Sequence, residues 1–394
     1  MFKDKQVILL GNKNPIIRPK KIFDKEIIEF LDQISKTILK NKEKISFPEI
    51  ISFGFWCRKN NINNQKKNYL DYVFRVGKGK IFHITPKNVP INFAYSLVAG
   101  LLSGNHNIIR VHSKNCEITN TICKIINEVL KKKKFSVFKN YILVINYNSS
   151  SDLTEKYSLE CDSRIIWGGD KTVNSIKKMK TKTDSIDISF PDRFSLCLIN
   201  VKKLNNKNLI DLASKFYNDS YIMDQSACSS PHLIIWINYS QKSNLIKKFW
   251  DEVYKLVKKK YSFTDYLSFN KFQKSNENLI LLKKNVVDFK NYSNLLHLTE
   301  IKNLDYRLEE IRGLAGSFYN IFLKDINSLK DVNSEKFQTL TYFGFEKKFL
   351  IDLAKNNFLL GVNRICPLGR ALNFSLFWDG KDLVQSLSRV INIE

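Results

Sequence analysis

The sequence predicts an α/β protein in which a Rossmann-type domain with a parallel sheet is followed by a second α/β domain. Short apolar runs alternate with longer stretches of helical periodicity from about residue 79 onward, a pattern typical of strands joined by helices. The chain has 394 residues, which is enough for two or three domains of ordinary size. Hydrophobic residues make up 43% and aromatic residues 12%, which excludes a wholly disordered or fibrous chain.

The elements of the Rossmann-type domain occupy the first half of the chain. Residues 24–40 carry apolar side chains every three or four positions and predict an amphipathic helix, whereas the polar residues 60–67 predict an exposed loop. Further on, the apolar runs predict strands at 80–85, 107–111, 141–145 and 164–167, and helices at 90–104, 116–130 and from 170.

The second domain is expected from about residue 203. A strand at 194–199 closes the first half, and the alternation then resumes. The pattern predicts a helix at 209–216, a strand at 233–237 and a helix at 243–259, whose apolar residues share one side.

The charge balance is strongly basic, with 64 Lys and Arg against 38 Asp and Glu and a formal net charge of +26. Such a charge suits a nucleic-acid partner, because cations neutralise phosphates. The lysines are, however, scattered among abundant Asn and Ile, as codon bias in an AT-rich genome produces. No basic stripe is interleaved with aromatic residues, so we expect no nucleic-acid partner.

Composition also predicts the compartment. The longest mild apolar run, residues 91–102, is shorter than the roughly 20 residues of a membrane helix, so no integral membrane segment is expected. The first residues do not resemble a secretory signal. The seven cysteines are odd in number and contain no CxxC pair, which favours a reducing, cytoplasmic location and no metal site.

Two pairs of glycines could cradle a phosphate. Gly77 and Gly79 precede a predicted strand and lack a third glycine, so a hairpin turn is expected there. Gly168 and Gly169 stand where a strand leads into a helix, which lets a ligand approach the backbone beside the helix N-terminus. The spacing alone leaves open an ordinary tight turn with Asp170 as the helix N-cap.

Two further segments carry candidate chemistry. Cys228 stands among small polar residues just before a predicted strand, where a thiol can be exposed, although a buried structural cysteine is the alternative. Asn88 follows a predicted strand between two prolines. Its amide could donate into a cleft at the carboxyl end of a parallel sheet or simply cap the next helix.

Taken together and in this order, these segments resemble the LuxC-type acyl-CoA reductases, a branch of the aldehyde dehydrogenase superfamily. The likeness extends from about residue 75 to the C-terminus, and several separated motifs agree in order and spacing. The matching stretches are HITPKNVPINFAYSLVAGLLSGN at 83–105, IRVHSK at 109–114, WGGD at 167–170, DQSACSSP at 224–231, QTLTYFG at 338–344, RICPLGRAL at 364–372 and FWDG at 377–380.

The resemblance implies an aldehyde-dehydrogenase-like fold. Residues 1–202 would hold an N-terminal helical segment and the NADPH-binding domain, residues 203–370 the catalytic domain, and residues 371–394 a segment that returns to the cofactor domain. Cys228 falls at the catalytic cysteine of the superfamily. Asn88 falls at the asparagine that forms the oxyanion hole with the backbone N–H of that cysteine.

The cofactor residues that the resemblance implies are Arg110, Ser113, Lys114, Gly168, Gly169 and Thr172. Lys114 stands where the superfamily has a glutamate. An ammonium group cannot accept hydrogen bonds from a free ribose diol but attracts a 2′-phosphate, so this residue favours NADPH over NADH. Asp170 would repel a phosphate, and the glycine backbone and Thr172 are therefore the expected contacts.

The residues before the strand at 194–199 bear on the direction of the reaction. The superfamily has there a glutamate that activates hydrolytic water, whereas residues 189–193 of this chain are SFPDR. The missing base favours reduction of acyl thioesters over oxidation of aldehydes. His232, next to Pro231, is a candidate proton carrier for the departing thiolate, with a structural role as the alternative.

The resemblance therefore predicts NADPH-dependent reduction of a long-chain fatty acyl-CoA, or another acyl thioester, to the aldehyde through a cysteine acyl-enzyme. In the best-known members of this family, the aldehyde is consumed in a luminescence reaction. The donor could be acyl-CoA, an acyl carrier or an acyl-enzyme, and a homo-oligomer or an acyltransferase or synthetase partner stays open. The alternatives are an oxidative aldehyde dehydrogenase and a non-enzymatic basic nucleotide- or RNA-binding protein.

Overall fold

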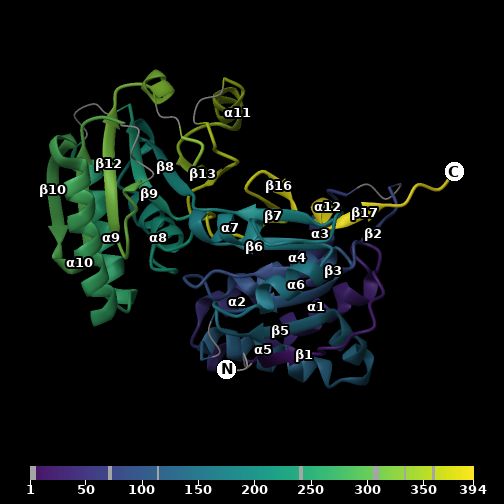
Figure 1. Ribbon diagram of the computed structural model, residues 1–394. Helices are drawn as coiled ribbons and strands as arrows, with labels where there is room; N and C mark the ends of the chain where they lie inside the picture. The colour runs from purple at the N-terminus through teal and green to yellow at the C-terminus, as the bar shows by residue number, and fades with distance from the viewer. Residues whose placement is uncertain are drawn as a thin grey trace. The chain divides into compact units, whose positions relative to one another are not determined.

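The chain forms two compact α/β units (Figure 1). The computed structural model describes residues 6–69, 73–112, 115–238, 243–304, 310–331, 334–356 and 360–394. The first unit comprises Met1–Pro191 and Phe374–Glu394, and the second comprises Asp192–Asn373. The predicted α/β class with mainly parallel sheets is confirmed.

A six-stranded sheet forms the centre of the first unit. Its five parallel strands lie in the doubly wound order β5-β4-β3-β6-β7, and β1 adds an antiparallel edge. Across the sheet the strands are β1 (Val7–Gly11), β5 (Ile142–Asn146), β4 (His106–Arg110), β3 (Lys80–Ile84), β6 (Ser163–Trp167) and β7 (Ile186–Phe190). The chain order reverses between β3 and β6, and this switch point is where open parallel sheets bind ligands.

Helices follow the strands of this sheet, as the apolar periodicity predicts. Those of the first unit are α1 (Lys25–Lys40), α2 (Pro48–Trp56), α3 (Lys59–Lys66), α4 (Asn92–Leu102), α5 (Glu117–Leu130), α6 (Leu153–Glu160), α7 (Asp170–Lys177) and α12 (Leu383–Ser386). Helix α1 begins where Asp24 accepts hydrogen bonds from two backbone N–H groups of the first turn. Its buried apolar residues form one face, which packs against α2 and α5.

Two local expectations for the first unit are wrong. The polar stretch at 60–67, expected as a loop, lies mostly in α3, because Ile62 is buried and Asp32 accepts the backbone N–H of Lys59. The segment of Gly77 and Gly79 forms no hairpin with β3. Strand β2 (Arg75–Gly77) instead pairs antiparallel with β17 (Ser388–Val390) from the C-terminal segment.

The C-terminal segment belongs to the first unit through specific contacts. The side chain of Asn105 donates to the carbonyl of Leu387 at 2.8 Å, and Tyr69 donates its hydroxyl to Asp382 at 2.9 Å. The short strands β15 (Phe377–Trp378) and β16 (Lys381–Asp382) precede α12. These bonds fix residues more than 280 positions apart in the sequence.

The second unit is built on a seven-stranded sheet, parallel except for β10 at one edge. Across the sheet the strands are β10 (Val286–Tyr292), β11 (Leu296–Ile301), β12 (Ser317–Leu323), β9 (Pro231–Ile237), β8 (Phe194–Asn200), β13 (Phe337–Phe343) and β14 (Arg364–Pro367). Strand β8, which the sequence-based division grouped with residues 1–202, pairs here with β9 and β13. Because both of these partner strands belong to the second unit, β8 belongs to it as well.

Helices and aromatic packing complete the second unit. The helices are α8 (Leu209–Ser220), α9 (Ser243–Lys260), α10 (Asp265–Leu282) and α11 (Lys347–Lys355). On one face of the sheet α8 and α9 bury a cluster in which Phe216, Trp250 and Phe318 have ring centroids 4.9–5.7 Å apart. No helix in the described part of the chain has the length and apolar character needed to cross a membrane.

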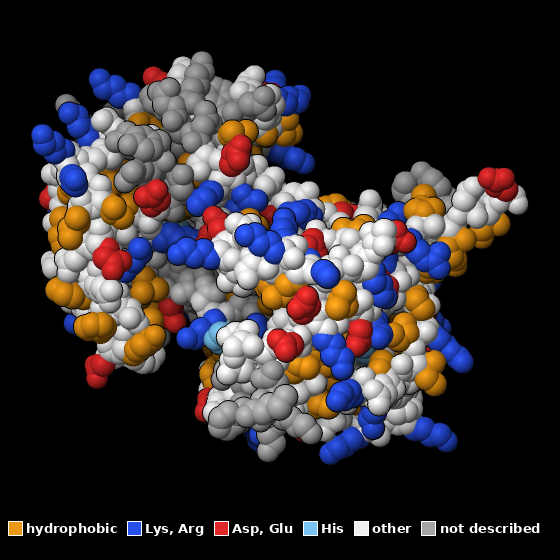
Figure 2. Space-filling model, in the orientation of Figure 1, with side chains coloured by type: hydrophobic (Ala, Val, Ile, Leu, Met, Phe, Trp, Pro, Cys, Tyr) orange, Lys and Arg blue, Asp and Glu red, His pale blue; other side chains and the backbone are white. Residues whose placement is uncertain are grey.

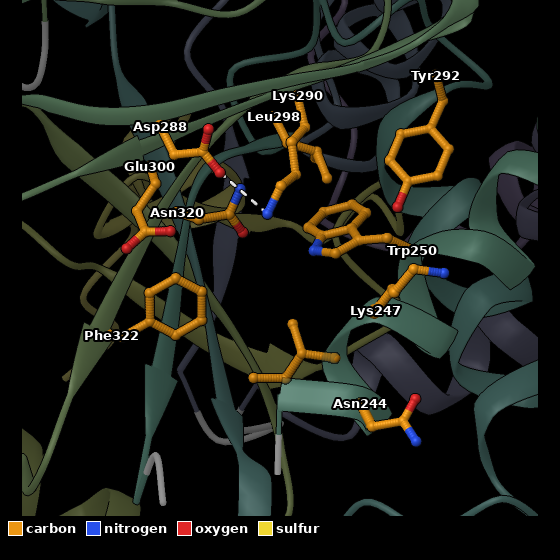
Figure 3. A pocket seen from close by; sticks show the side chains of 11 residues that line it. Asn244, Lys247, Trp250, Asp288, Lys290, Tyr292, Leu298, Glu300, Asn320 and Phe322 are labelled. Carbon is orange, nitrogen blue, oxygen red and sulfur yellow. Dashed lines mark ion pairs between the residues drawn. The ribbon is translucent and has the colours of Figure 1, made fainter. Parts of the chain in front are cut away.

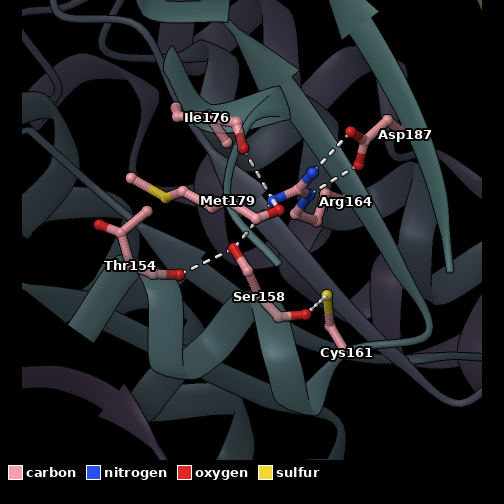
Figure 4. A network of polar contacts seen from close by, with 7 residues as sticks. All are labelled: Thr154, Ser158, Cys161, Arg164, Ile176, Met179 and Asp187. Carbon is pink, nitrogen blue, oxygen red and sulfur yellow. Dashed lines mark hydrogen bonds and ion pairs between the residues drawn. The ribbon is translucent and has the colours of Figure 1, made fainter. Parts of the chain in front are cut away.

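One buried ion pair organises the helices beside β6 (Figure 4). Arg164 of β6 is 1% exposed, and its guanidinium donates to both carboxylate oxygens of Asp187 on β7 at 2.6 Å. The remaining donors reach the hydroxyl of Ser158 on α6 and the carbonyl of Ile176 on α7. A single side chain therefore ties two helices to two strands.

We expect Asp187→Ala to lower the free energy of unfolding by about 2–3 kcal/mol, because it leaves a buried guanidinium without its counter-charge. The carboxylate of Asp187 is partly exposed, so the loss should be smaller than for a fully buried ion pair. Urea titration followed by circular dichroism measures this change. The control is Asp184→Ala, which removes an exposed carboxylate nearby and should change stability by less than about 0.5 kcal/mol. Equal effects of the two variants would contradict the role given to Arg164.

Candidate active site

Cys228 lies in a tight loop of the second unit, between α8 and β9. Asp224 and Gln225 adopt left-handed backbone angles, with φ of 51° and 58°, although neither is glycine. Two successive residues of this kind are strained, and such strain persists only where the surroundings hold it. The backbone N–H of Gln225 donates to the carbonyl of Ser220 at 2.7 Å and closes the turn.

The side chain of Gln225 holds this loop in place. It is 1% exposed and makes four hydrogen bonds. Its carbonyl oxygen accepts the N–H groups of Gly316 and Ser317, both at 3.1 Å, and its amide donates to the carbonyls of Pro231 and Ser317. A buried amide bonded on both sides fixes the loop to the starts of β9 and β12.

The thiol of Cys228 receives a hydrogen bond from a distant part of the sequence. The amide nitrogen of Gln338, in β13, lies 3.3 Å from Cys228 Sγ. Ser195 of β8 donates its hydroxyl to the carbonyl of Cys228 at 2.7 Å and accepts the N–H of Thr339 at 3.2 Å. An N–H donor stabilises a thiolate more than a thiol, so Gln338 favours the nucleophilic form of the cysteine.

Exposure sets Cys228 apart from most of the other cysteines. Five of the seven are buried, and burial raises the pKa of their thiols; these are Cys57, Cys123, Cys161, Cys197 and Cys366. Cys228 and Cys116 are partly exposed, and none of the seven forms a disulfide. Of these two partly exposed thiols, Cys228 is the one whose loop is held in place by side-chain hydrogen bonds, as a positioned nucleophile requires.

His232, the candidate proton carrier, is a structural residue. It is buried, its Nδ1 accepts the backbone N–H of Gly313 at 3.1 Å, and its ring stacks on Phe194. Burial lowers the pKa of His232 well below its ordinary value. The ring is therefore neutral, and its contacts hold the segment that also binds Gln225.

The first unit places the other candidate residues along one edge of its sheet. Asn88 follows β3, Arg110 is the last residue of β4, and Gly168 with Gly169 follow β6. These are neighbouring strands on both sides of the switch point, and their carboxyl ends meet at the same edge. Ser113 and Lys114 lie outside the residues that the structure describes.

Arg110 and the turn before α7 fit a nucleotide. The guanidinium of Arg110 lies 5.0 Å from the centre of the Tyr147 ring, and in the described part of the chain its buried Nε has no hydrogen-bond partner. Gly169 is the N-cap of α7 and, as a glycine, has no side chain with which to cap the helix. A phosphate fits such a helix start, because its N–H groups point outward. Thr172 is exposed in the first turn of α7.

A separate pocket of about 550 Å³ opens between α9 and strands β10 to β12 of the second unit (Figure 3). Its walls carry the indole of Trp250, the ring of Phe322 and the ion pair of Lys290 with Asp288. The pocket lies toward the carboxyl ends of β11 and β12, whereas the Cys228 loop lies at the amino end of β9. The described residues that line it include no cysteine or serine, and we assign it no part in the acyl chemistry.

Three residues of the site were not predicted. Gln225 and Gln338 both stand in stretches that resemble the family, yet the sequence gives them no role, because their partners lie 92 and 110 positions away. Ser195 sits in an ordinary apolar strand pattern and offers no signal at all. The pairing of β8 with β9 and β13 brings Ser195 and Gln338 to Cys228, whereas Gln225 stands in the same loop as the cysteine.

Comparison with known proteins identifies the family. The family model described as acyl-CoA reductase (LuxC) matches residues 57–390. A search of curated proteins found none that matches. Among solved structures, glyceraldehyde-3-phosphate dehydrogenase from Methanocaldococcus jannaschii in complex with NADP superposes with a TM-score of 0.66 at 14% identity, covering 93% of this chain and 88% of that chain.

A second solved structure shows the same architecture. The NAD-dependent benzaldehyde dehydrogenase from Corynebacterium glutamicum has a TM-score of 0.65 at 11% identity, covering 93% of this chain and 84% of that chain. At such identities the likeness establishes the fold. The chain therefore has the aldehyde dehydrogenase fold and belongs to the acyl-CoA reductase (LuxC) family.

Proposed function

We propose that this protein reduces long-chain fatty acyl-CoA to the aldehyde with NADPH, through an acyl-enzyme on Cys228. The observation that carries the proposal is the partly exposed Cys228 thiol, which lies on a clamped loop and receives the N–H of Gln338. The family match supports an acyl thioester as the substrate. The preference for long chains and for CoA over a carrier protein rests on the resemblance.

In the first step the Cys228 thiolate attacks the thioester carbonyl carbon. A bond from Sγ to this carbon forms, the bond from the carbon to the CoA sulfur breaks, and CoA leaves with the electron pair. The resulting acyl-enzyme divides one difficult reaction into two easier ones. Before the attack, the Gln338 amide stabilises negative charge on Sγ from 3.3 Å.

The carbonyl oxygen becomes negatively charged during this attack and needs donors. The proposed donors are the backbone N–H of Cys228 and the side-chain amide of Asn88, as the resemblance implies. Ser195 and Gln225 support the first of these donors, because they hold the backbone of the loop that presents it. Losing one such donor typically lowers kcat by about 10²–10³.

NADPH would be held by the carboxyl edge of the first sheet. Arg110, the backbone of Gly168 and Gly169, and Thr172 are the described residues proposed to contact it. The resemblance also implies Ser113 and Lys114, which lie outside the described residues. When bound, NADPH supplies the hydride that converts the Cys228 thioester to the aldehyde. Residues 189–193 lack the glutamate that would direct water onto the acyl-enzyme, which supports reduction over hydrolysis.

Replacing the nucleophile tests the acyl-enzyme. On incubation with a long-chain acyl-CoA, the intact mass of the protein is expected to rise by one acyl group, and NADPH should discharge this group as aldehyde. Cys228→Ala should form no adduct. Cys116→Ala, which removes the other partly exposed thiol, should behave as the wild type. An adduct that persists in Cys228→Ala would refute the assignment of the nucleophile.

Gln338 is tested through the reactivity of the thiol. Gln338→Ala removes the amide donor, so alkylation of Cys228 by iodoacetamide at mildly acidic pH should slow by about tenfold, as expected for loss of a hydrogen bond to a charged group. Gln338→Glu keeps the shape but presents a carboxylate, and should slow the reaction further. In both variants the curve of alkylation rate against pH should shift to higher pH. If the curve does not shift, Gln338 only packs against the thiol and does not stabilise the thiolate.

The cofactor preference is tested at Lys114. Lys114→Glu should lower kcat/KM for NADPH relative to NADH by about ten- to hundredfold, since it replaces a cation near the proposed 2′-phosphate with an anion. Lys124→Glu changes an exposed lysine on α5 and serves as the control. If both variants keep the wild-type ratio, Lys114 does not select the cofactor.

A further inference from the structure

Helix α10 is inverted relative to an ordinary surface helix. Its buried residues are the polar Lys271, Ser275 and Asn278. Several of its exposed residues are large and apolar: Tyr266, Phe269, Phe272 and Ile280 are 76%, 67%, 64% and 68% exposed. A surface helix normally buries its apolar stripe, so this arrangement needs a physical cause.

The polar residues of α10 face inward because the helix covers a set of backbone carbonyl groups that need hydrogen-bond donors. Lys271 Nζ donates to the carbonyls of Asn294 and Ala315 at 2.8 and 2.9 Å. Asn278 donates to the carbonyl of Arg312 and to the hydroxyl of Tyr319. Rotating the helix to bury its apolar side would leave these buried carbonyls without donors. The orientation of α10 is therefore fixed from within.

The next strand in the chain, β10, also exposes apolar side chains. We define the α10 face as Tyr266, Phe269, Phe272, Ile280 and Leu281 of α10 with Val287 and Phe289 of β10. Figure 2 shows hydrophobic side chains gathered over the part of the molecule where Figure 1 labels α10 and β10. The helix has 18 residues, which gives the face a length of about 27 Å.

Lysines stand at both ends of the α10 face. Lys258, Lys259 and Lys260 end α9 just before α10, and Lys283 and Lys284 follow it directly. All five are exposed, and no ion pair is recorded for them within the described residues. The helix has two exposed carboxylates, Asp265 at its start and Glu277, which pairs with Lys274 at 3.6 Å; exposed Gln273 and Asn276 also stand among the apolar residues. Exposed aromatic and aliphatic side chains with lysines at both ends of the helix can bind an anionic lipid surface, through insertion of the apolar groups and attraction of the cations to phosphates.

We propose that the α10 face docks onto an anionic phospholipid surface, with α10 in the plane of the headgroups. The aromatic and aliphatic side chains enter the headgroup–acyl boundary, and the flanking lysines contact lipid phosphates. Charge favours this occupant over a second copy of the chain, because each copy carries a formal charge of +26. The proposal stands on surface geometry and charge and does not depend on the proposed reaction.

The test is sedimentation of the full-length protein with phosphatidylcholine vesicles, with or without phosphatidylglycerol. The protein should bind the anionic vesicles only, and rising salt should release it. Phe269→Ser/Phe272→Ser should weaken binding about tenfold or more. Lys283→Glu/Lys284→Glu should weaken it at least as much, since each lysine near the surface is worth about fivefold.

Matched controls distinguish binding through the α10 face from non-specific adsorption of the protein to vesicles. Ile210→Ser removes an exposed apolar side chain of α8, and Lys131→Glu/Lys132→Glu reverses two exposed lysines after α5; both should bind vesicles as the wild type does. Circular dichroism checks that each variant folds. Absence of binding to anionic vesicles, or equal losses in the controls, would overturn the proposal. The proposal would also be overturned if Phe269→Ser/Phe272→Ser dissociated an oligomer of the protein and left vesicle binding unchanged.

Discussion

The arrangement of the second unit depends on the backbone of residues 312–317, the segment that leads into β12. Three separate parts of the chain bind it. The Gln225 side chain and the carbonyl of the adjacent Asp224 together accept three of its N–H groups. The ring of His232 accepts a fourth, and Lys271 donates to two of its carbonyls. Ala315 and Gly316 have left-handed φ angles of 48° and 90°. A segment with so irregular a backbone cannot pair its groups as a strand or helix does, so side chains must supply the partners.

The candidate residues of the two units lie at opposite ends of their strands. In the first unit the candidate residues follow strands, at the carboxyl edge where the crossover helices diverge and leave room for a ligand. In the second unit Cys228 precedes β9, and its neighbours Ser195 and Gln338 each stand at the second position of their strands. Strand starts suit a nucleophile, because a sheet holds them rigidly while the loop before them stays accessible.

Much of this architecture could be predicted from periodicity, and the limits have definite causes. Strands β3 to β6 of the first sheet carry short apolar runs, as burial on both faces requires, and each of these four was predicted within two residues. The edge strands β1 and β7 were not predicted. Helix α3 was missed because a single buried residue, Ile62, and one capping carboxylate stabilise it. Gln338 was missed as a partner of Cys228 because the contact depends on the pairing of β13 with β8.

Helix α10 shows most clearly where a binary pattern of polar and apolar residues fails. The usual argument assumes that the surface beneath a helix is apolar, so that apolar side chains gain most by facing it. Here the surface beneath is the carbonyl-rich backbone of residues 312–316 and Asn294, and a buried ammonium is the group that satisfies it. Burial lowers the pKa of Lys271 to about 7, while the three carbonyls that surround Nζ favour its charged form. The irregular segment that positions the Cys228 loop thus also determines which side of α10 faces water, and the exposed apolar face follows from the same constraint as the site.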